Sequence, residues 1–171
     1  MPFRGRGRPR AGRPPRGRGV RRRRGGDEIS LDDSIGVGVP AQVRDLAERV
    51  RKAAPGIPLR AHFHNTRNTG YANAFAAAEA GIEALDASTG GYGGCPFAPN
   101  ATGNIATEAL AYGFHRSGID TGVDTATVCE TATWLSGLLD KAPPALLGRA
   151  GFFRPEDSRQ TPVISRAGVP A

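Results

Sequence analysis

Two histidines, His62 and His64, stand two residues apart in the stretch PLRAHFH, residues 58–64, which is predicted to be a β-strand. Side chains at positions i and i+2 of a strand point to the same face, so both imidazoles should project together near the strand's carboxyl end. Two convergent imidazoles form half of a metal site. The simpler interpretation is a pair of inert, hydrogen-bonded residues, but at the end of a buried parallel strand the spacing favours metal binding. Arg60 should share this face one layer deeper.

A single cysteine, Cys95, lies in a glycine-rich stretch, STGGYGGCPFAPNATGN, which covers residues 88–104. Glycine readily adopts positive φ and lets the backbone approach a ligand closely. Loops of this kind often carry function. Cys95 is therefore a candidate reactive thiol, and a spare cysteine in a surface loop is the equally weighted alternative.

Three further polar residues stand where predicted elements end or begin. Asp32 and Asp33 end a predicted strand, and one of the two should face inward with the histidines, unless both only shape a turn. Asn104 stands at the start of a predicted helix, where an N-cap role is the default interpretation.

The elements that must position these residues alternate between strand and helix. Hydrophobic periodicity predicts strands over 28–33, 58–64 and 82–87, and helices from Pro40 to about residue 54 and over 72–80, 104–116 and 124–140. No clear period follows Pro143. This alternation is typical of an α/β protein with a parallel sheet or barrel. Three βα units do not close an eight-stranded barrel.

Charge is distributed very unevenly along the chain. The 171 residues include 23 Lys and Arg and 16 Asp and Glu, a formal net charge of +7. Eleven of the arginines and none of the acidic residues lie within residues 1–26, so residues 27–171 carry 12 basic and 16 acidic side chains. Residues 1–26 are mainly Arg, Gly and Pro and are predicted to be disordered. Such a segment could bind single-stranded nucleic acid, although aromatic residues are nearly absent.

Cys95 and Cys129 are the two cysteines of the chain, and their spacing indicates no disulfide framework. Free thiols without a secretory signal predict a reducing compartment, the cytoplasm. No apolar run approaches the roughly 18 residues of a membrane span, so no membrane partner is expected.

Several motifs together resemble the hydroxymethylglutaryl-CoA lyase family, metal-dependent lyases with a TIM-barrel catalytic domain. They are EISLDDSIGVG, HFHNT, GYAN, LDAS, GGYGGCPFAPNATGN, ATEAL and GIDTGVD, between about Asp27 and Leu139. The loop around Cys95 is the specific motif, because the related isopropylmalate and citramalate synthases share HxH but lack the GGCP loop. The resemblance implies an α/β fold that is a partial TIM barrel, about the last three βα units.

The resemblance also implies a role for each candidate residue. His62 and His64, on the seventh strand, and Asn104, after the eighth, look like ligands of a divalent metal, Mg²⁺ or Mn²⁺. Cys95 looks like the catalytic cysteine of a loop that closes over the substrate, and Asp33 matches an active-site acid. The implied reaction cleaves a 3-hydroxy-acyl-CoA, such as 3-hydroxy-3-methylglutaryl-CoA, to acetyl-CoA and a keto acid, with Cys95 protonating the enolate. The implied partner is an acyl-CoA, and a full-length chain would form a homodimer.

Two departures from the family limit what the chain is expected to do. The family's first strand supplies a metal-binding Asp and a catalytic Arg, and strands one to five have no counterpart here. Asn65 stands where the family usually has Asp. We therefore expect a C-terminal barrel part over 27–142, a tail over 143–171, and weak or no lyase activity unless a separate chain supplies the missing strands. Out-of-frame translation of GC-rich DNA would explain residues 1–26. The alternative is an Arg-rich nucleic-acid-binding protein that carries a barrel remnant.

Overall fold

The computed structural model describes residues 26–94 and 103–153. Residues 1–25, 95–102 and 154–171 lie outside the described residues. The expected disorder of the arginine-rich segment and the expected role of Cys95 therefore concern parts of the chain beyond this description.

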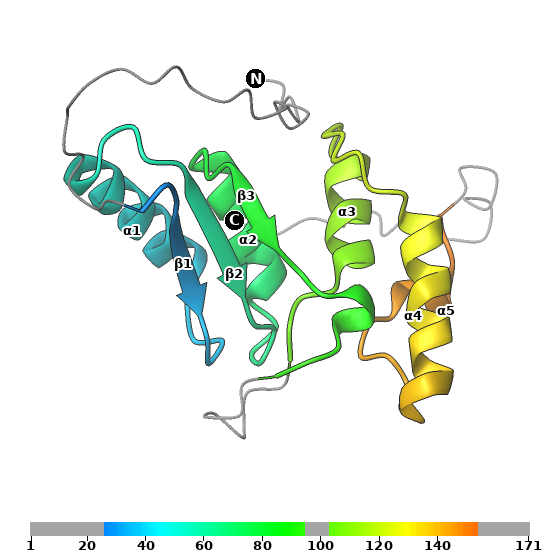
Figure 1. Cartoon of the computed structure of the whole chain (residues 1–171). Coiled ribbons are helices and arrows are strands. Elements are labelled where there is room, and N and C mark those ends of the chain that lie inside the picture. The colour runs from blue at the N-terminus through cyan, green and yellow to red at the C-terminus, as the bar shows by residue number, and fades with distance from the viewer. Residues whose placement is uncertain (1–25, 95–102, 154–171) are drawn as a thin grey trace, which may run out of the picture.

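Three parallel strands form one sheet in the order β1–β2–β3. They are β1 (Ile29–Asp33), β2 (Leu59–Phe63) and β3 (Ala84–Asp86). Parallel neighbours need a crossover connection, and here helices supply it. Figure 1 shows the first two helices on the same face of the sheet and the later helices beyond the β3 edge. The predicted alternation of strand and helix is confirmed.

Five α-helices and one 3₁₀ turn accompany the sheet in the described part of the chain. They are α1 (Pro40–Ala53), α2 (Gly70–Glu79), η1 (Thr89–Gly91), α3 (Thr107–Arg116), α4 (Thr125–Leu139) and α5 (Leu147–Ala150). The four long helices are those that periodicity predicts, with their ends shifted by up to three residues. The sequence predicts neither η1 nor α5, because helices this short leave no periodic pattern. None of the described helices is both long and apolar enough to cross a lipid bilayer.

Local chemistry sets where the helices begin. Pro40 is the first residue of α1, where its missing N–H would have no partner in any case and its fixed φ suits a helix. α4 begins after Asp124, whose carboxylate accepts hydrogen bonds from the backbone N–H groups of Ala126 and Thr127. The Thr127 hydroxyl and these N–H groups lower the pKa of Asp124.

The hydrophobic core lies between the sheet and the helices α1, α2 and α3. β2 contributes Leu59, Ala61 and Phe63, which are at most 3 % exposed. The rest of the core cluster consists of Val43, Ala47, Ala74, Ala77, Ile82, Ile105, Leu110 and Phe114. Burying one large apolar side chain contributes roughly 1.5–3 kcal/mol, so this face of β2 anchors the sheet to its helices.

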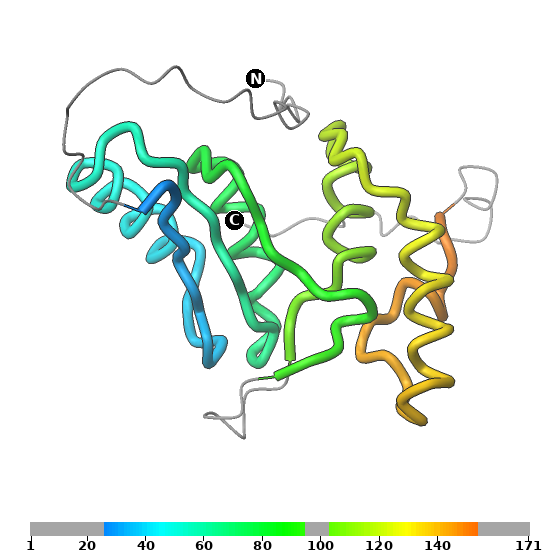
Figure 2. The backbone as a smooth tube through the Cα atoms, in the orientation of Figure 1, coloured from blue at the N-terminus to red at the C-terminus, as the bar shows by residue number. Residues whose placement is uncertain are grey.

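The opposite face of the sheet is polar. His62 alternates with the buried residues of β2, and its partners in register, Asp32 and Asp86, share its side of the sheet. One layer deeper, Arg60 donates hydrogen bonds to the carboxylates of Glu28 and Asp86. Within the described residues no helix or strand covers this face, as the tube in Figure 2 shows.

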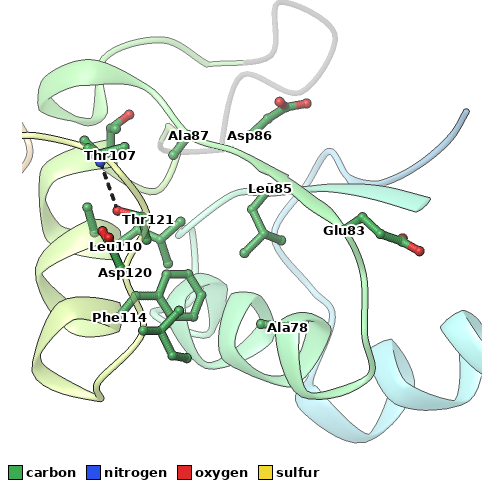
Figure 3. A pocket seen from close by; sticks show the side chains of 13 residues that line it. Ala78, Glu83, Leu85, Asp86, Ala87, Thr107, Leu110, Phe114, Asp120 and Thr121 are labelled. Carbon is green, nitrogen blue, oxygen red and sulfur yellow. Dashed lines mark hydrogen bonds between the residues drawn. The ribbon is translucent and has the colours of Figure 1, made fainter. Parts of the chain in front are cut away.

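A cavity of about 390 Å³ lies between β3 and α3 (Figure 3). Apolar residues of both elements line it, among them Leu85 and Phe114. Figure 3 shows that Leu85 and Asp86 leave β3 on opposite sides. The cavity follows the Leu85 side, which is the helix-covered face of the sheet. Asp86, which lies beside His62 in the strand register, also borders this cavity.

Leu59→Ala should lower the free energy of unfolding by about 2–5 kcal/mol, because it removes a fully buried side chain and leaves a cavity. Leu138→Ala is the matched control: Leu138 is 67 % exposed on α4, and its loss should change stability by less than about 0.5 kcal/mol. Urea unfolding followed by circular dichroism measures both. Equal effects of the two substitutions would contradict the core described above.

Candidate functional site

The two histidines meet at the carboxyl end of β2, as their spacing predicts. Their rings contact edge to face, with centroids 5.1 Å apart and ring planes at 73°. His62 is partly exposed on the polar face of the sheet. His64, the first residue after the strand, is only 5 % exposed. Together they present one accessible and one buried imidazole at the same edge.

Asn104 reaches this edge from a distant part of the sequence. Its backbone forms an isolated antiparallel bridge with His64. The neighbouring residue Asn65 continues the contact, because its N–H donates to the carbonyl oxygen of Gly103 at 3.0 Å. The chain therefore leaves β3, passes through the glycine-rich segment, and returns across the end of β2.

A backbone carbonyl, and not helix α3, holds the side chain of Asn104. The expectation that Asn104 caps this helix is wrong, because the N-cap is Ala106 and Ile105 still donates to the carbonyl of Phe63. Nδ2 of Asn104 donates to the carbonyl oxygen of Tyr92 at 2.9 Å. A carbonyl oxygen only accepts, so the amide nitrogen must face it and the carboxamide oxygen Oδ1 faces away.

His64 lies in a buried and electrostatically mixed environment. Burial lowers its pKa most, and the charge of His62 lowers it further. Three contributions raise the pKa of His64, and they come from Asp33, Asn104 and the backbone of Ser34. The net shift is downward, which favours the neutral imidazole, the form that binds metals.

One ring nitrogen of His64 lacks a hydrogen-bond partner. Its Nδ1 atom is buried and has no hydrogen-bond partner within the described residues. A buried polar atom without a partner is costly and calls for an explanation. A metal ion would satisfy this lone pair, so the residue fits a ligand role.

The two aspartates at the end of β1 take different positions. Asp32 is the register partner of His62 on the polar face. The carboxylate of Asp33 accepts hydrogen bonds from the backbone N–H groups of Val37 at 3.0 Å and Gly38 at 2.9 Å. Asp33 thus closes the turn after β1, while Asp32 is the one that shares a face with His62.

Glycines form the base of the loop that carries Cys95. Gly93 and Gly103 have φ of +104° and +89°, in the left-handed region that favours glycine. A Cβ on Gly103 would lie 2.9 Å from the carbonyl oxygen of Gly93, and a Cβ on Gly93 would lie 2.7 Å from Nδ2 of Asn104. The two ends of the loop therefore touch backbone to backbone, and side chains would force them apart.

The turns that follow β1 and β2 also touch each other. A Cβ on Gly36 would lie 2.7 Å from Oγ1 of Thr66. Nη1 of Arg67 donates to the carbonyl oxygens of Ile35 at 3.1 Å and Gly36 at 3.0 Å. These contacts hold the carboxyl ends of the two strands at a fixed separation.

Sequence reasoning misses two contributors to the site. Glu108 is 1 % exposed and accepts a hydrogen bond from the N–H of Gly90 at 3.1 Å. From the sequence, a glutamate in the first turn of a helix is expected to lie on the surface. Tyr92 acts through its backbone carbonyl, which no side-chain pattern reveals. Within residues 26–94 and 103–153 no three His, Cys, Asp or Glu side chains gather to hold a metal, so Asn104 is needed for a three-donor set.

Comparison with known proteins points to one family. The HMGL-like family model matches residues 20–135. The (R)-citramalyl-CoA lyase of Chloroflexus aurantiacus is 46 % identical over 82 % of this chain and 44 % of that protein. The mitochondrial hydroxymethylglutaryl-CoA lyase of Gallus gallus is 38 % identical over 72 % of this chain and 41 % of that protein.

Solved structures agree with these sequence matches. An HMG-CoA lyase from Acenitobacter baumannii, in complex with coenzyme A and 3-methylmalate, is similar with a TM-score of 0.67 and 41 % identity over 72 % of this chain. The similar region covers 40 % of that chain, so the present chain spans less than half the length of its relatives. The predicted α/β fold, a partial TIM barrel, is confirmed.

Gly103→Ala should destabilise the protein more than Gly56→Ala. Both glycines have positive φ, +89° and +80°, so each alanine costs about 1–2 kcal/mol of backbone strain. At Gly103 the new Cβ also meets backbone atoms, whereas at Gly56 nothing lies within 4 Å, so Gly103→Ala should lose roughly 1–3 kcal/mol more. Chemical denaturation of the two variants measures the difference. Equal losses would show that the loop base is not closely packed.

Proposed function

This chain belongs to the HMGL-like family, and we propose that it forms part of a lyase that cleaves a 3-hydroxy-acyl-CoA to acetyl-CoA and a keto acid. The observation that carries the proposal is the meeting of His62, His64 and Asn104 at the carboxyl edge of the sheet. The names of the relatives, citramalyl-CoA lyase and hydroxymethylglutaryl-CoA lyase, support an acyl-CoA as the substrate class.

His62, His64 and Asn104 are the residues proposed to hold a divalent cation. Two observations support this assignment: the buried Nδ1 of His64 has no partner among the described residues, and the carboxamide oxygen of Asn104 is not the atom that faces the Tyr92 carbonyl. Nitrogen donors beside one oxygen donor suit Mn²⁺ better than Mg²⁺, which prefers oxygen ligands. When bound, such a cation polarises the hydroxyl and carbonyl oxygens of a substrate as a Lewis acid.

The proposed cleavage requires two proton movements. The proton of the 3-hydroxyl leaves, the carbon–oxygen bond becomes a carbonyl, and the bond between C2 and C3 breaks with its electron pair on C2, beside the thioester. A proton must then reach C2. We assign that proton to the thiol of Cys95, two residues beyond Gly93 at the base of the loop. A thiol can donate a proton as a general acid.

Asp33 is the acidic residue that we propose as the proton acceptor of the site. Its charge acts on His64, so the carboxylate lies near the proposed metal ligands. Two backbone N–H groups, from Val37 and Gly38, fix the orientation of this carboxylate. We assign to this carboxylate the role of general base that accepts the proton of the substrate hydroxyl.

Release of acetyl-CoA from 3-hydroxy-3-methylglutaryl-CoA or (R)-citramalyl-CoA in the presence of Mn²⁺ tests the proposed function. His64→Ala should slow this release at least ~10-fold, because it removes a metal ligand. His115→Ala should leave the rate unchanged, since His115 is exposed and bonded to Thr121. The assay also includes a separate chain that supplies strands one to five of the barrel. The proposal fails if acetyl-CoA is then released from neither thioester, or if both substitutions act equally.

Cys95→Ala should slow acetyl-CoA release by ~10²–10⁴-fold and leave Mn²⁺ affinity unchanged, because a general acid is lost while the metal ligands remain. Cys129→Ala is the matched control. Cys129 lies on α4, and burial raises the pKa of its thiol. A steady-state assay combined with Mn²⁺ titration separates the two effects. An unchanged rate for Cys95→Ala would rule out the proton-transfer role.

A further inference from the structure

Glu108 is a buried acidic residue that the proposed chemistry does not use. It lies in the first turn of α3 and is 1 % exposed. The helix N-terminus favours its negative charge. Burial raises the pKa of Tyr71 and of Cys129, and the charge of Glu108 adds to both shifts. Glu108 therefore lies at a point where α2, α3 and α4 approach one another.

The carboxylate of Glu108 holds the 3₁₀ turn η1 through Gly90. The N–H of Gly90 donates to Oε2 of Glu108 at 3.1 Å, and its carbonyl accepts from the N–H of Ala145 at 3.0 Å. A Cβ on Gly90 would lie 2.8 Å from the ring of Tyr92 and 3.2 Å from Ala132. The N–H of Gly90, its carbonyl oxygen and its close packing thus all hold this residue in place.

The turn presents the carbonyl oxygen of Tyr92 to Asn104. This oxygen accepts two hydrogen bonds, from Oγ of Ser88 at 2.6 Å and from Nδ2 of Asn104 at 2.9 Å. The side chain of Tyr92 is also held in place, because the Tyr92 hydroxyl donates a hydrogen bond to the carbonyl oxygen of Lys141 at 2.6 Å. The orientation of the Asn104 carboxamide therefore depends on where η1 places Tyr92.

We propose that Glu108 is a positioning residue for Asn104. Its carboxylate fixes Gly90, the turn places the Tyr92 carbonyl, and that carbonyl orients the carboxamide of Asn104, whose backbone bridges to His64. The consequence for metal binding rests on the proposed function, whereas the orientation of Asn104 does not require a metal. Removing a partner that orients a metal ligand lowers metal affinity by ~10–100-fold.

Three substitutions on two helices test this role. Glu108→Ala leaves the N–H of Gly90 without an acceptor, and Mn²⁺ affinity should fall at least ~10-fold. Glu108→Gln keeps a neutral oxygen at the same place, so its affinity should stay within about threefold of the original chain. Glu130→Ala, on the exposed side of α4, is the control and should change nothing. Isothermal titration with MnCl₂ measures all three.

A second measurement needs no metal. Nuclear magnetic resonance reports hydrogen exchange of the Asn104 side-chain amide in the metal-free protein. Exchange should speed up about tenfold in Glu108→Ala and stay slow in Glu108→Gln, because only the alanine releases the turn. If Glu108→Ala does not fold, Glu108→Asp replaces it. The shorter side chain keeps the charge but moves the carboxylate away from the N–H of Gly90, so the same faster exchange of the Asn104 amide is expected.

The two measurements separate the two claims. A chain that binds no Mn²⁺ contradicts the proposed function, but its Asn104 amide still tests the positioning role. A folded Glu108→Ala or Glu108→Asp variant with unchanged amide exchange and unchanged Mn²⁺ affinity would overturn the role of Glu108.

Discussion

β2 is hydrogen-bonded along both edges, and its two neighbours run parallel to it in a defined register. This pairing fixes which side of the strand each residue occupies, because side chains alternate between the faces. Leu59, Ala61 and Phe63 are buried toward the helices, so His62 must project from the polar face. The same strand therefore anchors the fold and presents the histidines, and a shift of one residue would exchange the two faces.

The end of β2 also organises the return of the glycine-rich segment. Asn104 bridges to His64, and Gly103 packs against the carbonyl of Gly93 at the loop base. The carboxamide of Asn104, from beyond β3, is thereby brought close to the histidines. The polar face beside this site, with Asp32 and Asp86 in the row of His62, has the side-chain character of a barrel interior. A polar face of this kind agrees with the similarity to longer proteins, of which this chain covers 44 % and 40 %.

Sequence patterns predict the parts of this structure that depend on near neighbours. The strands, the four long helices and the shared face of His62 and His64 follow from periods of 2 and 3.6 residues. The distinction between Asp32 and Asp33 requires strand register, which no local pattern gives. The contact of Asn104 with Tyr92, and the burial of Glu108, depend on how distant segments pack. The N-cap expectation for Asn104 fails for the same reason, because pairing with β2 delays the start of α3 to Thr107.

Pulsed electron paramagnetic resonance of the Mn²⁺-loaded chain tests the central claim most directly, because it detects nitrogen atoms bound to the ion. The account predicts ¹⁴N couplings from the imidazoles of His62 and His64, with one coupling lost in His62→Ala and one in His64→Ala. Couplings from water protons alone, unchanged by either substitution, would contradict the assignment of these histidines as metal ligands.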